Sequence, residues 1–94
     1  MKFEYDQAKS EANVVKHGIS LEEAKVLWSM PESVEIKARS IGEERLMIIN
    51  RLEGKFYSCV FTRRGEAVRL ISFRRSRKYE EELFYGKIRK SQIH

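Results

Sequence analysis

The sequence predicts an α+β fold in which helices pack against one antiparallel sheet. Apolar residues recur at helical spacing near both ends of the chain, whereas the middle holds four β-rich segments, 33–38, 45–51, 55–61 and 67–73. The short connections between these segments carry turn residues, which favours antiparallel neighbours. With a short strand at residues 2–5, the predicted element order is β-α-α-β-β-β-β-α.

The first predicted helix covers residues 7–17. Asp6 is placed to cap its first turn, and Gly18 follows its last residue, where a left-handed backbone commonly ends a helix. The residues of this helix that we expect to face the core are Ala8, Ala12 and Val15.

A second helix is predicted over residues 21–29, closed by Pro31. Ser20 and Glu23 have the spacing of a capping box, in which each side chain accepts a hydrogen bond from the other residue's backbone amide. The expected buried stripe consists of Leu21, Ala24, Leu27 and Trp28.

The segments 55–61 and 67–73 are predicted to be neighbouring strands with alternating faces. In the first, one face holds Phe56, Ser58, Val60 and Thr62, and the other holds Tyr57, Cys59 and Phe61. In the second, strict alternation groups Val68, Leu70, Ser72 and Arg74 against Arg69, Ile71, Phe73 and Arg75. The last predicted helix spans 76–90, with Ser76 as its cap and Tyr79, Leu83 and Phe84 turned inward.

Composition indicates one folded domain over residues 1–94. Hydrophobic residues make up 41% of the chain, enough for a modest core, and no apolar run is long enough for a membrane span. A single cysteine, Cys59, cannot form an intrachain disulfide or a cysteine-based zinc site. The segment "MKFEYD" has no apolar signal region, so we expect a cytoplasmic protein.

Positive charge is concentrated in the last third of the chain. Residues 63–94 carry ten Lys/Arg and four Asp/Glu, a net charge of +6, against a net charge of +5 for the whole chain. Because part of this segment alternates like a strand, its guanidinium groups are expected to be held on a rigid element. Such groups suit phosphate, and nucleic acid is the commonest polyanion that a protein meets.

Three blocks of the sequence carry a family resemblance. They are residues 3–24, "GEER" (42–45), which opens a predicted strand, and "VFTRRGEAVRLISFRR" (60–75). Together they resemble the BrnT family of bacterial toxins, whose last block reads V-x-T-x-R-x-x-x-[IV]-R-[IL]-I-S-A-R. The first block, residues 3–24, matches the family at Phe3, Asp6, Lys9, Asn13, Lys16, His17, Gly18, Glu23 and Ala24. Tyr5, Leu21 and Phe73 depart from the usual Trp, Phe and Ala.

The resemblance implies a RelE-like fold and a metal-free ribonuclease activity that arrests translation, with no cofactor. It also implies a BrnA-like antitoxin of the ribbon-helix-helix class, and a complex that binds operator DNA and represses its own operon. Within that complex, pairs of toxins are expected to be bridged by antitoxin dimers into a heterotetramer.

Metal-free RNA cleavage needs a base and an acid for the two protons and cations for the charge that builds on phosphorus. Our candidates for catalysis are Arg64, Arg74, His17 and Glu44. Our candidates for binding RNA phosphates are Lys16, Arg69, Arg75, Arg77 and Lys78.

Each candidate also has a simpler interpretation. The arginines can form a solvated basic face, and His17 can stabilise the end of its helix through the helix dipole. Glu44 can form a salt bridge with Arg45 or Arg69. The alternative functions are therefore a non-catalytic nucleic-acid-binding module, or a degenerate toxin that acts as a corepressor with its antitoxin. Phe73 keeps the second alternative open, because a large ring there can either narrow a site or fill the core.

Overall fold

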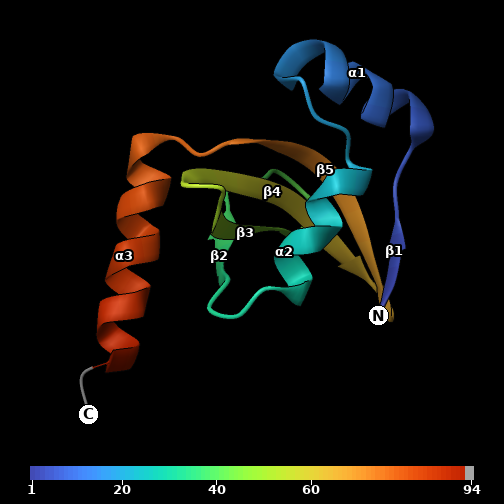
Figure 1. The fold of residues 1–94 in the computed structure, drawn as a ribbon. Coiled ribbons are helices and arrows are strands. Elements are labelled where there is room, and N and C mark those ends of the chain that lie inside the picture. The colour runs from blue at the N-terminus through green and yellow to red at the C-terminus, as the bar shows by residue number, and fades with distance from the viewer. Residues whose placement is uncertain (93–94) are drawn as a thin grey trace.

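A computed structural model describes residues 1–92 of the protein (Figure 1). The elements follow the predicted order, with a short 3₁₀ helix, η1, before the second helix. They are β1 (Lys2–Glu4), α1 (Gln7–His17), η1 (Glu22–Lys25), α2 (Val26–Ser29), β2 (Val34–Ala38), β3 (Arg45–Leu52), β4 (Lys55–Arg64), β5 (Ala67–Arg75) and α3 (Lys78–Gln92).

The five strands form one mixed sheet in the order β1-β5-β4-β3-β2. β2 to β5 form an antiparallel meander as predicted, but β1 pairs with β5 in parallel, so the expectation of a wholly antiparallel sheet is wrong at this edge. The reason is topological. No hairpin joins β1 to β5, since the helices carry the chain from β1 to the opposite edge at β2, and nothing forces the two strands to run in opposite directions.

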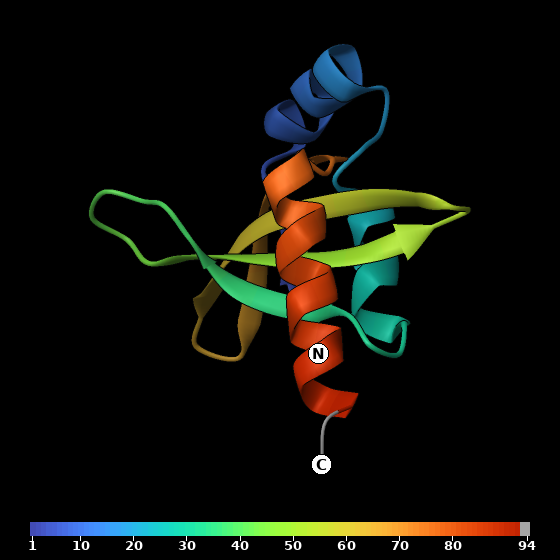
Figure 2. The same cartoon turned by 90° about the vertical axis from the view of Figure 1, so that its left-hand side faces the viewer.

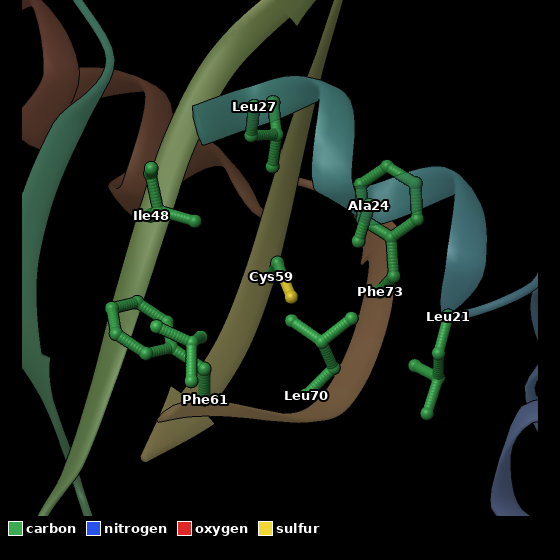
Figure 3. Close-up of a cluster of buried hydrophobic side chains, with 9 residues drawn as sticks. Leu21, Ala24, Leu27, Ile48, Cys59, Phe61, Leu70 and Phe73 are labelled. Carbon is green, nitrogen blue, oxygen red and sulfur yellow. The ribbon is translucent and has the colours of Figure 1, made fainter. Parts of the chain in front are cut away.

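Helices cover both faces of the sheet (Figure 1). On one face, η1 and α2 bury Ala24 and Leu27 in the larger core cluster, which is drawn in Figure 3 and contains Ile48, Phe61 and Leu70. On the other face, Phe84 of α3 joins a smaller cluster with Val34, Met47, Ile49 and Phe56. Cys59 is fully buried in the larger cluster, which raises the pKa of its thiol and leaves it unreactive.

Helix α1 packs through polar residues, so the prediction for its buried face is wrong. Asp6 and Gly18 cap the helix as expected, with Gly18 in the left-handed conformation at φ 79°. However, Ser10 and Asn13 are the buried residues of the helix, whereas Val15 is 89% exposed. The Asn13 side-chain amide donates to the carbonyls of Ile19 and Phe73 (both 2.7 Å), and its oxygen accepts from the Phe73 amide (3.1 Å).

The second helical segment matches its prediction closely. The Ser20 amide donates to the Glu23 carboxylate (2.7 Å) and the Glu23 amide to the Ser20 hydroxyl (3.4 Å), which completes the capping box. Leu21, Ala24 and Leu27 are fully buried. Trp28 packs against the core edge-on to Phe3 and Phe61, and its indole N–H is buried without a hydrogen-bond partner in the described part of the chain.

A β-bulge changes which residues of β5 share a face. Val60 pairs with Ser72 but Phe61 pairs with Leu70, so β5 has one extra residue at Ile71. The alternation therefore shifts after the bulge, and Phe73 joins Leu70 and Val68 in the larger core cluster. The strict alternation expected for β5 is wrong for this reason, whereas the two predicted faces of β4 are confirmed.

Helix α3 is rotated from its predicted orientation. Phe84 is buried as expected, but Glu80 is fully buried while Tyr79 and Leu83 are exposed. Ser76 does not cap the helix, which begins at Lys78. Its hydroxyl instead forms a hydrogen bond with the hydroxyl of Ser58 on β4 (2.7 Å).

Candidate functional site

Three of the predicted arginines lie in a row on the α3 face of the sheet. Arg69 pairs with Thr62, and Arg74 pairs with Ser58, which belongs to the same face of β4 as Val60 of the smaller core cluster. Alternation along β4 from Thr62 places Arg64 on this face as well. We call Arg64, Arg69 and Arg74 the arginine row; their side chains are 54%, 29% and 14% exposed, respectively.

Arg64 and Arg69 are more accessible than Arg74, which is bound to Glu80 of α3. Helix α3 crosses the sheet, and the β2–β3 connection and the β4–β5 turn project beyond it on the same side. No helix covers this part of the face in the described chain (Figure 2). By contrast, Arg75 pairs with Tyr57 on the opposite face, and its guanidinium lies 5.8 Å from the centre of the Tyr57 ring. The structure therefore does not bring Arg75 together with the row.

The ion pairs of the row differ in strength along its length. Arg64 lies 3.6 Å from Glu43, and Arg69 lies 3.7 Å from Glu4. Both distances exceed those of a good hydrogen bond, and the groups are partly exposed, so these pairs are weak and their N–H groups can bind an anion.

Arg74 is held much more firmly, by Glu80. Two parallel hydrogen bonds of 2.8 Å join its guanidinium to the Glu80 carboxylate. Burial acts to raise the pKa of Glu80, but hydrogen bonds from Arg74, the Arg77 amide and the Ser58 hydroxyl outweigh it and lower this pKa to about 2. The pair is thus fixed in charged form, and Arg74 keeps guanidinium N–H groups that Glu80 does not use.

His17 ends α1, and Asn13 of the same helix is hydrogen-bonded to the backbone of Phe73, the residue before Arg74, which holds this end of the helix next to Arg74 in β5. Partial burial and the positive charges of Lys16 and Arg74 lower the pKa of His17 below its ordinary value of 6.5. The imidazole is therefore mainly neutral at pH 7, which is the state of a general base. We call His17 and Arg74 the His17–Arg74 centre.

The structure separates two of the predicted catalytic residues from this centre. Arg64 lies six residues along β4 from the partner of Arg74, which corresponds to about 20 Å. Glu44 lies at the same far end, where its carbonyl accepts a hydrogen bond from the Thr62 hydroxyl (2.8 Å). Its exposed carboxylate forms no ion pair with the rest of the described chain, so neither salt bridge considered for Glu44, to Arg45 or Arg69, is present.

The remaining predicted phosphate-binding residues surround the centre. Lys16 precedes His17, and Arg77 and Lys78 lie where β5 passes into α3; all three are exposed. Arg77 is tied to the centre through its backbone, since its amide donates to Glu80 (2.9 Å).

Sequence reasoning missed two residues of this region. Glu80, which was not among the candidates, orients Arg74 from within the fold. Tyr79 was expected in the core, yet it is 52% exposed beside Arg74. The available signal for Glu80 was that three consecutive acids, Glu80 to Glu82, follow the strand arginines closely, but the sequence does not distinguish which of them forms a buried pair.

The centre can supply two of the things that RNA cleavage requires. A neutral imidazole can accept the proton of a 2′-hydroxyl, and fixed guanidinium groups can stabilise charge on a phosphate. Among residues 1–92, no group of three or more His, Cys, Asp or Glu side chains is arranged to hold a metal ion.

Comparison with known protein families decides the family. The sequence profile described as "Ribonuclease toxin, BrnT, of type II toxin-antitoxin system" matches residues 5–80. The chain belongs to the BrnT family. A BrnT protein is a ribonuclease toxin of a type II system, so RNA is its substrate and a protein antitoxin is its partner. No curated protein matches this BrnT chain. None of its helices within residues 1–92 is long and apolar enough to span a membrane.

Proposed function

We propose that this BrnT protein is a metal-independent endoribonuclease that cleaves RNA and thereby inhibits translation. The observation that carries the proposal is the His17–Arg74 centre at one end of an open, basic sheet face. His17 accepts the proton of the 2′-hydroxyl, whose oxygen attacks the adjacent phosphorus, and Arg74 stabilises the charge that develops there. The bond from phosphorus to the 5′-oxygen breaks, which leaves a 2′,3′-cyclic phosphate, and the departing 5′-oxygen takes a proton from solvent. Arg69 and Arg64 bind neighbouring phosphates along the row, while Lys16, Arg77 and Lys78 add positive charge around the centre.

Glu44 and Arg75 have no part in this reaction centre. Glu44 is at the far end of the row, and Arg75 is on the other face of the sheet. Phe73 does not argue for a degenerate toxin, because its ring is 2% exposed and fills the larger core cluster. The Phe73 ring makes apolar contacts inside the fold. It lies on the opposite face of the sheet from Arg69 and Arg74, so it does not narrow the space around them.

The proposal for the protein partner follows from the family of the chain and from the positive charge of the arginine row. A type II toxin is neutralised by a protein, and the proposed antitoxin is a BrnA-like ribbon-helix-helix protein. We expect it to bring acidic residues to the arginine row, to bridge two toxins in a heterotetramer and to bind operator DNA. The RelE-like fold and action in the cytoplasm, where messenger RNA is translated, belong to the same proposal.

The activity can be tested with purified protein and a single-stranded RNA in the presence of EDTA. The wild type should cleave the RNA, and the rate should fall as the pH drops below 6.5, because protonation removes the His17 base. His17→Ala should lower the rate by about 10²–10⁴-fold. The matched control is His94→Ala at the only other histidine of the chain, which should leave the rate unchanged.

Two results would contradict the proposal. Binding of RNA by the wild type without any cleavage would support the non-catalytic module instead. Cleavage that is equally fast in the wild type and in His17→Ala would show that RNA is cut elsewhere on the protein.

A further inference from the structure

A groove runs between the start of α3 and the edge strand β2, on the same face as the arginine row. Its volume is about 530 Å³, within the range of about 300–1,000 Å³ that is usual for ligand pockets. Its apolar lining comes from Ile36 and Ala38 of β2, Met47 of β3 and Leu83 of α3. We call it the β2–α3 groove.

The charged residues of the groove are all cations. Lys37, Arg39 and Arg77 line it, and no acidic residue does. Within residues 1–92, none of these three side chains forms an ion pair, whereas every member of the arginine row has a carboxylate within 4 Å. Lys37 pairs with Leu46, which packs against the larger core cluster, so its side chain lies on the other face of the sheet. An apolar floor bordered by the positive charges of Arg39 and Arg77 attracts a ligand that is flat and apolar in one part and anionic in another.

Tyr79 supplies an aromatic wall for such a ligand. It lines the groove, and its side chain is 52% exposed although it is one of the larger hydrophobic residues of the chain. In the described structure its ring contacts no other ring and its hydroxyl has no hydrogen-bond partner, unlike Tyr85 on the same helix, which binds Arg51 and packs on Phe56. The groove adjoins the His17–Arg74 centre through Arg77, which lines it and whose amide donates to Glu80, the partner of Arg74.

We propose that the β2–α3 groove binds one base of the RNA next to the cleaved linkage, stacked on Tyr79. The phosphates that flank this base are held by Arg39 and Arg77. A nucleotide matches the groove in both respects: its flat base can stack on Tyr79, and its phosphates can bind the two arginines. This inference rests on the proposed function. It implies that the groove determines which nucleotide the enzyme prefers next to the cleaved linkage.

The test measures binding separately from cleavage. A short 2′-O-methyl RNA, which lacks the attacking hydroxyl, is titrated with protein and followed by fluorescence anisotropy. Tyr79→Ala should weaken binding about tenfold, since stacking on an aromatic side chain contributes substantially to the affinity for each base. Tyr79→Phe keeps the ring and should bind like the wild type. Tyr85→Ala, a tyrosine on the same helix outside the groove, is the matched control and should also bind like the wild type.

A scan of abasic positions identifies the base. Removing the base that occupies the groove should weaken binding to the wild type about tenfold and have no further effect on Tyr79→Ala. Circular dichroism shows whether each variant is folded. If Tyr79→Ala is folded, a cleavage assay on ordinary RNA of mixed sequence should show a broadened choice of cleavage sites.

The outcomes separate this inference from the proposed function. If RNA binds tightly and its affinity changes neither with Tyr79→Ala nor with any abasic position, the proposed role of the groove is wrong. The proposed nuclease activity is not contradicted by that result. A wild type that neither binds nor cleaves RNA overturns both. If Tyr79→Ala binds RNA normally but loses affinity for an acidic antitoxin, the groove is a protein-binding surface and the inference is wrong.

Discussion

At the scale of single residues, the buried pair of Arg74 and Glu80 illustrates how the fold fixes a cation beside a histidine. Four hydrogen bonds converge on one carboxylate, from Arg74 (two), Ser58 and the Arg77 amide. Glu80 thereby connects β4, β5 and the start of α3. The pair fixes the position of Arg74, and the guanidinium N–H groups that Glu80 does not use remain able to donate to a phosphate.

This arrangement makes the stability of the protein depend on acid pH. The pKa of Glu80 is about 2 in the folded state against 4.5 for an unperturbed glutamate, so its contribution is present above pH 4.5 and is lost as the pH falls toward 2. Glu80→Ala should cost about 3–5 kcal/mol at pH 7, because it leaves Arg74 partly buried and unpaired. Urea denaturation at several pH values measures both effects.

The exposed pair of Arg63 and Glu35 is the control for this prediction. Its distance is 2.7 Å, but both side chains are largely exposed. Glu35→Ala should therefore cost no more than about 1 kcal/mol. Equal losses in the two alanine variants would show that Glu80 is not the structural anchor that its burial indicates.

At the scale of elements, α1 shows what sequence patterns could and could not predict. Its limits and both caps follow from Asp6 and Gly18, since capping is local chemistry. Its buried face does not follow, because Ser10 and Asn13 are buried through hydrogen bonds to backbone groups of Leu21, Ile19 and Phe73 that only the folded chain brings near. Apolar periodicity alone selected Val15, which is exposed.

The same reasoning explains the errors in the candidate site. A bulge of one residue in β5 is not visible in an alternating sequence, yet it changes the face of Phe73. The arginine row was not predicted, because strict alternation placed Arg69 and Arg74 on opposite faces of β5, and only the bulge brings them onto one face. The pairing of Arg74 with Glu80 was not predicted either, since it depends on the rotation of α3 relative to the sheet.

Asn13 should anchor α1 and, with it, His17. Asn13→Ala removes three hydrogen bonds and leaves the amide and carbonyl of Phe73 without partners, so we expect a loss of about 3 kcal/mol in unfolding free energy. Cleavage should also slow, because His17 ends the same helix. Val15→Ala, at an exposed position of α1, should change stability by no more than about 0.5 kcal/mol. If the two variants are equally stable by thermal denaturation, α1 is held by other contacts.

At the scale of the whole molecule, charge is distributed unequally between the two sheet faces. The α3 face carries the arginine row and borders the unpaired cations of the β2–α3 groove. On the opposite face, Arg63 and Arg75 lie over the rings of Phe61 and Tyr57, and Arg63 is also paired with Glu35. The α3 face is therefore the one for which we expect RNA and an acidic antitoxin to compete.

This asymmetry predicts how salt affects RNA binding in single-arginine variants. Each phosphate neutralised on a single strand contributes about −0.7 to the slope of log affinity against log salt concentration. Arg69→Ala should therefore weaken binding and make the slope shallower by about 0.7. Arg75→Ala removes the same charge from the same strand but on the other face, so its slope should equal that of the wild type. Anisotropy titrations with 2′-O-methyl RNA between low and moderate salt measure the three slopes. If the slope becomes shallower by the same amount in both variants, RNA affinity depends only on the net charge of the protein. The arginine row would then not be a specific RNA-binding site.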